Sequence, residues 1–169
     1  MTAAGATSTL GKITVRRYRA GDRRAVLAAF RSNVPDFFPA SEQSWLRACL
    51  DEPDGPLFVV LEQGEVVGFG GYELSPFYDL ATLVFGLVRK DRHGTGLGKL
   101  LLHYRLRHMA RQKLRPRYVT VDTHAHTAGF FKRCGFEQIT YWPGGYRSGM
   151  DRVDLRFELT DAALAALGN

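Results

Sequence analysis

The sequence has few cysteines and no long hydrophobic run. Only two cysteines, Cys49 and Cys134, occur among its 169 residues, and each lies within an apolar pattern. Two such cysteines do not form a disulfide framework, so we expect both to be reduced thiols in the core. No apolar run reaches the roughly 18 residues that span a bilayer, and residues 1–12 lack the apolar segment of a secretory signal. These absences predict a cytoplasmic protein without a membrane partner.

Length and composition predict one globular domain. Hydrophobic residues make up 45% of the chain and charged residues 24%, which are ordinary proportions for a soluble domain. A chain of 169 residues can bury one sizeable core. We expect a flexible tail over residues 1–11, the domain itself over residues 12–160, and a short helix or tail over residues 161–169. The oligomeric state cannot be read from the chain, and a homodimer stays open.

The positive charge of the chain has three interpretations. The formal net charge is +6, and basic residues are dense over residues 105–117. Most of these arginines are expected on a solvated helix face. A basic cleft could also attract an anionic ligand, or could bind nucleic acid. No aromatic residues alternate with the basic ones, so nucleic acid is the least favoured partner.

The hydrophobic pattern predicts a mixed α/β (α+β) domain. Apolar runs indicate strands at residues 13–18, 57–61, 66–72, 81–88, 118–121, 137–142 and 151–159. Helical spacing predicts helices that start at Asp22 and at Ser41, helices over residues 97–113 and 127–133, and a short helix after Thr160. Hairpin-linked strands pair antiparallel, whereas a strand–helix–strand crossover returns parallel. We therefore expect a mixed central sheet of about seven strands with flanking helices.

The second predicted helix has a start signal and one apolar face. Ser41 is expected to be its N-cap. The face expected to be buried carries Trp45, Leu46, Cys49 and Leu50.

A turn with three glycines joins the strand at residues 81–88 to the helix that begins near residue 97. It reads His93-Gly94-Thr95-Gly96-Leu97-Gly98. The glycines leave backbone N–H groups uncovered at the positive end of a helix dipole, which makes an anion site. Lys99 could reach a phosphate or be solvated, and Thr95 could touch a phosphate or cap the helix. The pattern predicts a pyrophosphate-binding turn.

Two other phosphate-binding motifs do not fit this turn. A P-loop requires Gly, four residues and then Gly-Lys-Ser/Thr, but His93 stands at the first position and Leu100 at the last. A dinucleotide fingerprint requires G-x-G-x-x-G and an acidic residue about 20 positions later. Lys99 takes the place of its third glycine, and residues 115–117 downstream are Arg-Pro-Arg. Neither nucleotide-binding family is expected.

The turn resembles the coenzyme A motif of the GNAT superfamily of N-acetyltransferases, Gln/Arg-x-x-Gly-x-Gly/Ala. The match departs at its first position, where His93 replaces Gln or Arg, but the backbone amides do not depend on that side chain. A second segment, TAGFFKRCGF at residues 127–136, resembles the family's A-x-x-F-Y-E-K-x-G-F element. The two motifs lie in the family's order with a strand between them. A looser resemblance covers residues 13–159.

The resemblance implies a GNAT-like fold in which two central parallel strands, here residues 84–88 and 119–123, splay apart around the pantetheine arm of coenzyme A. Acetyl-CoA is the implied acyl donor. The implied acceptor is a primary amine of a small molecule or peptide, which attacks directly in a ternary complex without a metal cofactor. Main-chain groups of Gly86, Leu87 and Val88 would pair with the pantetheine. The other implied cofactor contacts are His93, Gly94, Thr95, Gly96, Leu97, Gly98, Lys99, His124 and Phe131.

The proton-transfer residues common in this family are replaced in this chain. Phe131 stands where many members carry a Tyr that protonates the departing thiolate, and Thr82 stands where some carry a Glu base. An alkyl amine, with a pKa of about 10, is mostly protonated at neutral pH, so a base would help. The candidates are Glu73, Asp79 and His126 for the base, the first of them favoured, and Tyr146 for the acid.

Two further interpretations stay open. His124-x-His126 with nearby Asp122 invites a metal site, but no third and fourth ligands are recognisable. The favoured interpretation is that His126 caps the short helix and His124 lines the cofactor cleft. The missing Tyr and Glu also suit a non-catalytic module that binds acyl-CoA, which is the alternative to an acetyltransferase.

Overall fold

The computed structural model describes residues 11–146 and 149–168, so the tail predicted over residues 1–11 lies almost wholly outside the described residues. The strands are β1 (Ile13–Arg17), β2 (Leu57–Glu62), β3 (Glu65–Leu74), β4 (Leu80–Val88), β5 (Tyr118–His124), β6 (Glu137–Trp142) and β7 (Arg152–Glu158). The α-helices are α1 (Arg23–Ser32), α2 (Gln43–Asp51), α3 (Leu97–Ala110), α4 (Ala125–Arg133) and α5 (Asp161–Ala166). Short 3-10 turns are η1 (Ala20–Asp22), η2 (Ala40–Glu42) and η3 (Lys90–Arg92).

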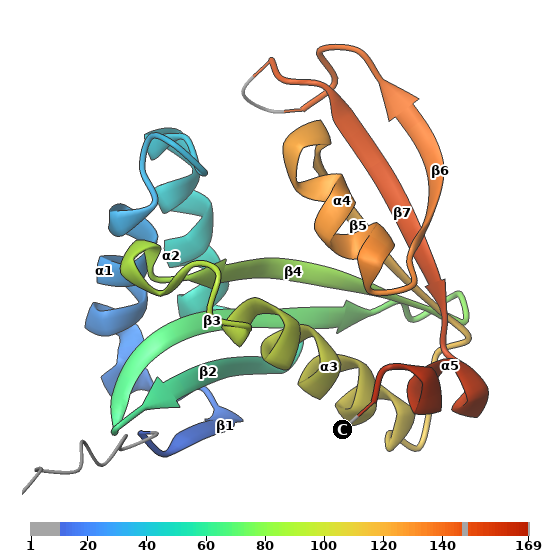
Figure 1. The fold of residues 1–169 in the computed structure, drawn as a ribbon, viewed down its shortest axis with the longest axis horizontal. Helices are drawn as coiled ribbons and strands as arrows, with labels where there is room; N and C mark the ends of the chain where they lie inside the picture. Colours follow the sequence, from blue (N-terminus) through green and yellow to red (C-terminus); the bar gives the residue numbers. More distant parts are fainter. Residues whose placement is uncertain (1–10, 147–148, 169) are drawn as a thin grey trace, which may run out of the picture.

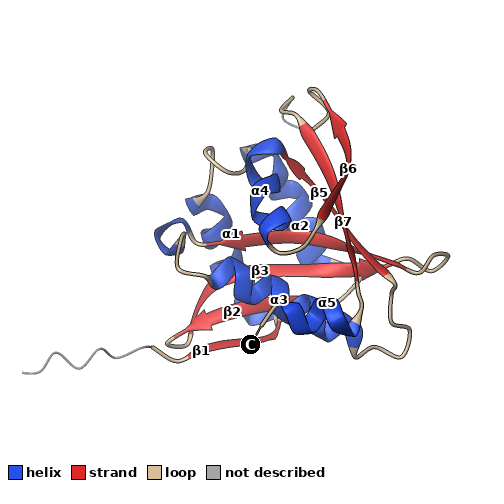
Figure 2. Cartoon of the chain, turned by 45° about the vertical axis from the view of Figure 1, so that its right-hand side comes forward, coloured by secondary structure: helices blue, strands red, loops and turns tan. Residues whose placement is uncertain are grey.

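Within the described residues, the strands form one seven-stranded sheet in the order β1-β2-β3-β4-β5-β7-β6. The pair β4 and β5 is parallel, because α3 crosses over between them, and the other neighbouring pairs are antiparallel. The predicted mixed sheet with flanking helices is confirmed. Figure 2 shows β1 to β4 side by side, with β5, β7 and β6 rising steeply away from them.

Both faces of the sheet are buried under helices. Alternate residues of a strand point to opposite faces, so Phe58 and Val60 of β2 join the core with α3 and α4, whereas Leu57 and Val59 join the core with α1 and α2. Figure 1 shows α3 crossing in front of the sheet. No helix among the described residues is both long enough and apolar enough to span a membrane.

The parallel strands β4 and β5 pair over a short stretch only. Their register joins Leu80 to Tyr118, Ala81 to Val119 and Thr82 to Thr120. Beyond these pairs the strands separate, and Figure 1 shows β5 leaving β4 at a wide angle beside α4. The splayed central pair implied by the family resemblance is present.

A bulge lies in β4 next to the point where the strands separate. The register with β3 shifts between Phe69 and Gly71, so that Gly70 opposes two residues, Phe85 and Gly86. Phe85 has φ 52°, and Gly86 has φ 154°. The bulge takes the Phe85–Gly86 peptide out of the regular ladder of hydrogen bonds.

Two predictions about the second helix are wrong. Ser41 lies inside η2, and the residue that precedes α2 is Glu42, which makes no side-chain cap. Pro39 leads into the 3-10 turn, which delays the α-helix to Gln43. Trp45 is 57% exposed instead of buried, because one helical residue turns by about 100° away from the inward face.

Two other helix ends differ from the predictions. The predicted end of α3 near residue 113 is three residues late, since α3 ends at Ala110 and Pro116 cannot continue a helix. The strand β5 is longer than predicted, since it extends to His124, which pairs with Arg152 of β7. The helix α4 follows directly and begins at Ala125, two residues earlier than predicted. The predicted cap, His126, therefore lies within α4, and His124 occupies the N-cap position.

Candidate functional site

One large cavity opens where β4 and β5 separate. Its volume is about 1360 Å³, and it extends from the glycine turn past the β4 bulge to the side of α2. The lining includes these residues predicted from the sequence: Glu73, Gly86, Leu87, Val88, His93, Gly94, Gly96, Leu97, Gly98, Lys99, His124, Phe131 and Tyr146. Thr95, His126 and Asp79 do not line it.

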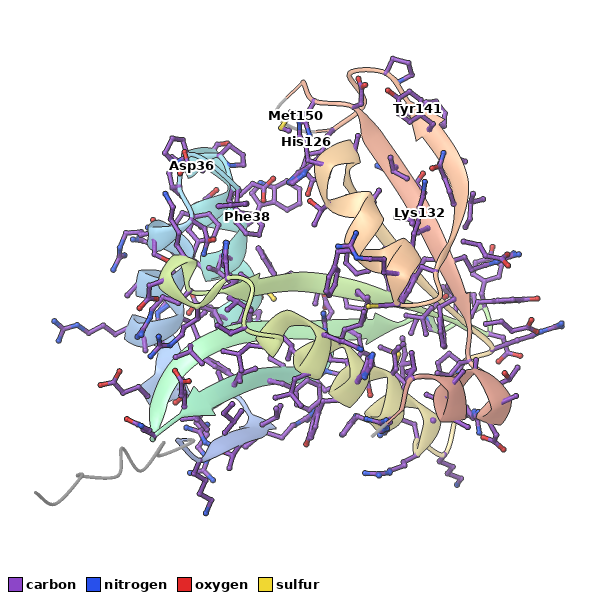
Figure 3. The ribbon with its side chains drawn as sticks, in the orientation of Figure 1. Asp36, Phe38, His126, Lys132, Tyr141 and Met150 are labelled. Carbon is purple, nitrogen blue, oxygen red and sulfur yellow. The ribbon has the colours of Figure 1, made fainter. Side chains whose placement is uncertain are left out.

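The opening of the cavity has two sides that come from distant parts of the chain. Figure 3 shows Asp36 and Phe38, from the segment between α1 and α2, on one side, and His126 and Met150, from α4 and the segment before β7, on the other. Phe38 belongs to the cavity lining, whereas His126 is exposed outside it.

The glycine turn presents open backbone at the start of a long helix. Gly94 and Gly96 have φ values of 75° and 85°, and a Cβ atom on either would meet no atom within 4 Å. Gly96 is the N-cap of the 14-residue helix α3, so the unpaired N–H groups of the first turn follow it. The Thr95 hydroxyl donates to the carbonyl of Arg92 at 2.6 Å and so closes the turn instead of capping α3. This geometry fits a phosphate.

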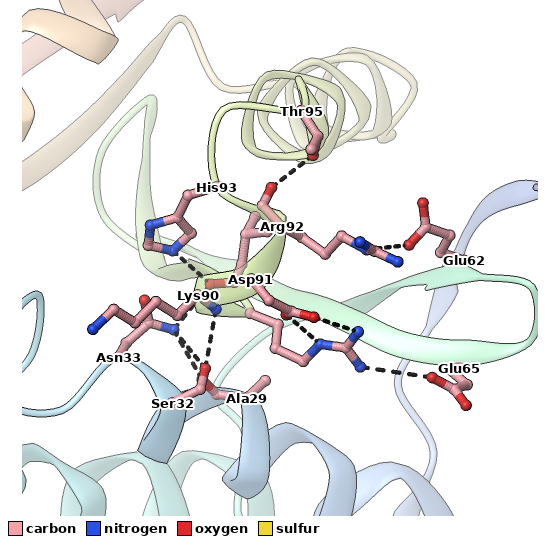
Figure 4. Close-up of polar contacts among 12 residues, drawn as sticks. Ala29, Ser32, Asn33, Glu62, Glu65, Lys90, Asp91, Arg92, His93 and Thr95 are labelled. Carbon is pink, nitrogen blue, oxygen red and sulfur yellow. Dashed lines mark hydrogen bonds and ion pairs between the residues drawn. The ribbon is translucent and has the colours of Figure 1, made fainter. Parts of the chain in front are cut away.

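Side chains from elsewhere hold the turn against the end of β4. Nε2 of His93 donates to the carbonyl oxygen of Val88 at 2.9 Å. The amide Nδ2 of Asn33 donates to the same oxygen at 2.9 Å and to Ala29 in α1, also at 2.9 Å. The ring of His93 also packs edge-on against Phe37, with ring centroids 4.6 Å apart. Figure 4 shows the hydrogen bonds of Asn33 and His93 where α1 meets the turn.

The main chain of Val88 faces the gap between the strands. The amide of Arg89 donates to Val67 in β3 at 2.8 Å, and residues alternate in direction along a strand. The peptide groups of Val88 therefore point away from β3, as the contacts of its carbonyl with Asn33 and His93 confirm. Its N–H lies on the same side and is directed toward the gap.

Carboxylates line the far end of the cavity, beside α2. Glu73 lies on β3 opposite Thr82 of β4, and within the described residues it forms no hydrogen bond or ion pair. Burial and, secondarily, the charge of Asp54 raise the pKa of Glu73. Burial, followed by the charges of Glu73 and Asp54, raises the pKa of the neighbouring Cys49 thiol to about 11. Glu52 also lines this end, which is electronegative.

His124 and Tyr146 lie together at the α4 side of the cavity. Their rings meet edge-on with centroids 5.1 Å apart, and Nδ1 of His124 lies 2.8 Å from the hydroxyl of Thr127. Burial lowers the pKa of His124, so its imidazole is neutral at neutral pH. Phe131 is 8% exposed and packs on Phe136. Residues 147–148 of the loop that follows Tyr146 lie outside the described residues.

Two buried residues of the cavity are not among the residues predicted from the sequence. Asn33 is absent from the predicted site residues, although it is 1% exposed and its side chain joins α1 to β4. Arg105 belongs to the basic stretch, most of whose arginines are expected on a solvated face, but it is itself only 2% exposed. Its spacing of four from Leu101 and from Met109, both buried, was the available signal, since such residues share one helix face.

Among residues 11–146 and 149–168, no group of three or more His, Cys, Asp or Glu side chains could hold a metal ion. His124 and His126 therefore have no further partners of this kind in the described part of the chain.

The sequence matches the model of a known protein family. A family model described as the acetyltransferase (GNAT) family matches residues 24–136. The chain belongs to the GNAT acetyltransferase family. Members of this family use acetyl-CoA as the acyl donor and act on amines of small molecules, peptides or proteins. No curated protein matches the sequence at a significant level.

Solved structures share the GNAT fold over nearly the whole chain. A proposed acetyltransferase of the GNAT family from Desulfovibrio desulfuricans superposes with a TM-score of 0.74 and 22% identity, over 88% of this chain and 100% of that one. The ribosomal-protein-S18-alanine N-acetyltransferase of Escherichia coli gives 0.70 and 19%, over 88% and 95%. Ard1 of Thermoplasma volcanium gives 0.71 and 18%, over 88% and 99%. At these identities the likeness establishes the fold alone.

Proposed function

We propose that this GNAT protein transfers an acetyl group from acetyl-CoA to a primary amine, by direct attack of the amine on the thioester in a ternary complex. The observation that supports this most strongly is the large cavity, which joins an open glycine turn at a helix start to Glu73 through the gap between β4 and β5. Glu73 is a half-buried carboxylate without a hydrogen bond or ion pair among the described residues. Donor and acceptor could meet in that gap with little ordering of the protein, which is the entropic advantage of a preformed site.

The glycine turn would hold the pyrophosphate of the donor. The N–H groups that follow Gly96 and the dipole of α3 favour negative charge there, and Lys99 lines the same part of the cavity. The N–H of Val88, directed into the gap, would pair with an amide of the pantetheine arm as an added strand does.

Glu73 would accept a proton from the protonated amine, directly or through a water, which frees the nitrogen lone pair. The nitrogen lone pair forms the new N–C bond while a pair of the thioester carbonyl moves to oxygen. Return of that pair breaks the C–S bond and releases the thiolate, which takes up the proton that the nitrogen loses as the amide forms. A base works best with a pKa near the working pH, and the raised pKa of Glu73 moves it in that direction.

The thiolate would leave without a strong acid beside it. Phe131 cannot donate a proton, and a thiol with a pKa of about 8.5 is a tolerable leaving group. Tyr146 is the proposed replacement donor, since it lines the cavity beside His124. His126 is the weaker base candidate because it is exposed outside the cavity lining.

A non-catalytic acyl-CoA-binding module is the second candidate. It is favoured by Phe131, and by Thr82, whose hydroxyl lies 3.2 Å from that of Thr120 and closes the narrow end of the gap without a carboxylate. Protein first checked for co-purified coenzyme A is assayed for thiol release from acetyl-CoA with a panel of amines, polyamines and peptide N-termini. Turnover with any amine supports the acetyltransferase. Tight acetyl-CoA binding without turnover across the panel supports the binding module.

A further inference from the structure

A buried arginine lies directly under the β4 bulge. Arg105 projects from the inward face of α3, is 2% exposed and lines the cavity. Its guanidinium rests against two glycines: a Cβ atom on Gly70 would lie 3.1 Å from Nη1, and one on Gly86 would lie 3.2 Å from Nη2. Glycine at these strand positions makes room for the guanidinium.

Within residues 11–146 and 149–168, the guanidinium of Arg105 has backbone partners but no carboxylate partner. Nη1 donates to the carbonyl oxygens of Gly71 at 3.1 Å and Phe85 at 3.0 Å. Among the described residues, Nε is buried without an acceptor, and no ion pair involves Arg105. Burial lowers the pKa of Arg105 to about 10. An unpaired buried charge weakens a fold, and a well-packed apolar side chain is often at least as stabilising, so core packing alone does not account for this residue.

The contact with Phe85 sets the direction of one peptide group. The Phe85–Gly86 bond is trans, and a planar trans peptide directs its C=O and its N–H in opposite directions. Since the carbonyl of Phe85 points at Arg105, the N–H of Gly86 points to the opposite side of β4. Both residues oppose Gly70 in the bulge, so this N–H is outside the β3–β4 ladder, and both line the cavity.

We propose that Arg105 is a positioning residue that presents the N–H of Gly86 to the carbonyl oxygen of the acyl thioester. The proposal rests on the proposed function, because it assigns the thioester to the gap beside the bulge. A charge-assisted hydrogen bond to the carbonyl of a peptide polarises the N–H of the same peptide. A preorganised donor of this kind stabilises the oxygen that gains charge as the amine bonds to carbon. It would support departure of the thiolate where Phe131 offers no proton.

The test uses acetyl-CoA carrying ¹³C at the thioester carbonyl, which needs no knowledge of the acceptor. The variants are Arg105→Met, which removes the charge at similar length, Arg105→Lys, and Gly70→Ala, which crowds the guanidinium without removing it. Arg107→Met is the matched control, since this arginine of the same helix reaches the carbonyl of Gly168 outside the cavity. Circular dichroism and Kd for acetyl-CoA are measured for each protein.

In the wild type we expect the bound thioester carbonyl resonance to move downfield from its position in solution. We expect Arg105→Met to lose most of that shift, Arg105→Lys and Gly70→Ala to retain part of it, and Arg107→Met to match the wild type, with Kd changing less than about twofold. With an amine that is turned over, kcat should fall at least about tenfold in Arg105→Met at little changed KM, in keeping with the loss of an oxyanion donor.

The outcomes separate this proposal from the proposed function. A wild-type resonance at its solution position, or a full shift in folded Arg105→Met, overturns the role of Arg105 while acetyl-CoA binding stands. If Arg105→Met does not fold, the other two variants decide. A full downfield shift of the carbonyl resonance in both Gly70→Ala and Arg105→Lys then overturns the role of Arg105. Absence of acetyl-CoA binding by the wild type overturns both proposals.

Discussion

At the scale of single residues, Gly96 allows the backbone of the turn and its ligand to be tested separately. Its φ of 85° lies in the left-handed region, while its Cα faces open space. Any other residue adds strain of roughly 1–2 kcal/mol. Gly96→Ala and Gly96→Glu share that strain, but only the glutamate fills the anion site with negative charge. We expect both to have similarly lowered melting temperatures, and coenzyme A to bind Gly96→Glu at least about tenfold (1.4 kcal/mol) more weakly than Gly96→Ala.

Isothermal titration calorimetry with coenzyme A checks this difference. Equal affinity of the two variants would place the pyrophosphate elsewhere, since the carboxylate would then have no anion to repel.

Glu73 should titrate in the pH dependence of the reaction. Its pKa is raised by burial first and by the charge of Asp54 second. Asp54→Asn removes that charge and should lower the pKa of Glu73, so the base form persists to lower pH. We expect the acidic limb of kcat/KM to move to lower pH in Asp54→Asn, and kcat to fall about 10²–10⁴-fold in Glu73→Gln. Asp161→Asn, which changes an exposed carboxylate paired with Arg115, serves as control. Wild-type kcat in Glu73→Gln, with an unmoved acidic limb, would assign the base elsewhere.

Residues with a distinctive local pattern could be predicted, whereas residues whose role depends on distant partners could not. The glycines at 94, 96 and 98 were predicted because they stand between a strand and a helix. The side chain of Asn33 donates to the carbonyl of Val88, 55 residues later in the chain, and no local sequence pattern predicts that contact. The burial of Arg105 could not be predicted, because it lies in a stretch dense in arginine and arginine side chains are usually solvated.

At the scale of elements, the junction of α1 with β4 depends on one buried amide. Nδ2 of Asn33 bridges the carbonyl of Ala29 and that of Val88. Asn33→Asp keeps the shape but sets a carboxylate against two carbonyls, and a buried mismatch of this kind costs about 1–3 kcal/mol or more. We expect the melting temperature to fall by at least about 2 °C, as measured by calorimetry.

Ser32→Ala is the matched control at this junction. The Ser32 hydroxyl donates to Ala29 in α1 and accepts from the amide of Lys90 in η3, just after β4, but in partly or fully exposed positions, where water can replace it. We expect its effect to stay within about 1 kcal/mol. An Asn33→Asp protein as stable as Ser32→Ala would contradict the bridging role.

Elements were predictable where periodicity was strong and less so at their ends. The strand β6 was predicted with its observed bounds. The start of α2 was displaced by η2, and that of α4 by the pairing of β5 with β7, which reaches His124. Both displacements depend on tertiary contacts or turn geometry that a cap signal in the sequence does not contain.

At the scale of the whole molecule, the cavity draws its lining from α2, β3, β4, α3, β5, α4 and the loop with Tyr146. The sequence predicted its two ends, the glycine turn and Glu73, through motif resemblance and strand order. It did not predict the contribution of α2, because the helix rotates Trp45 outward toward the cavity. The end of the cavity beside α2 could therefore be identified only from the three-dimensional structure.

The stability of the whole molecule should depend on pH in a range set by three histidines. Burial lowers the pKa of His103, His108 and His124 in the folded state. Unfolded, these side chains have their ordinary pKa of about 6.5, so the unfolded chain binds more protons below that pH and stability falls as the pH drops. Buried Asp22, whose pKa is lowered by its hydrogen bond from Arg16, loses its contribution only below its ordinary value of 3.8. The loss of stability due to the histidines therefore occurs at higher pH than the loss due to Asp22.

We expect the melting temperature to be nearly level from pH 8 to 7 and to decline from about pH 6.5 toward pH 5. His108 makes the clearest single test, because its Nδ1 lies 2.8 Å from the hydroxyl of Tyr72, whose pKa burial raises to about 12. The amide Nε2 of Gln112, which can only donate, lies 3.3 Å from the same Nδ1, so Nδ1 is the acceptor and the hydroxyl donates to it. Protonation of His108 destroys that acceptor. His108→Asn offers an amide oxygen that accepts the same hydroxyl but does not titrate, so its decline between pH 6.5 and 5 should be shallower than that of the wild type. Parallel curves for the two proteins, measured by calorimetry in matched buffers, would mean that His108 stays accessible to protons in the folded state and that its burial beside Tyr72 contributes nothing to the pH dependence.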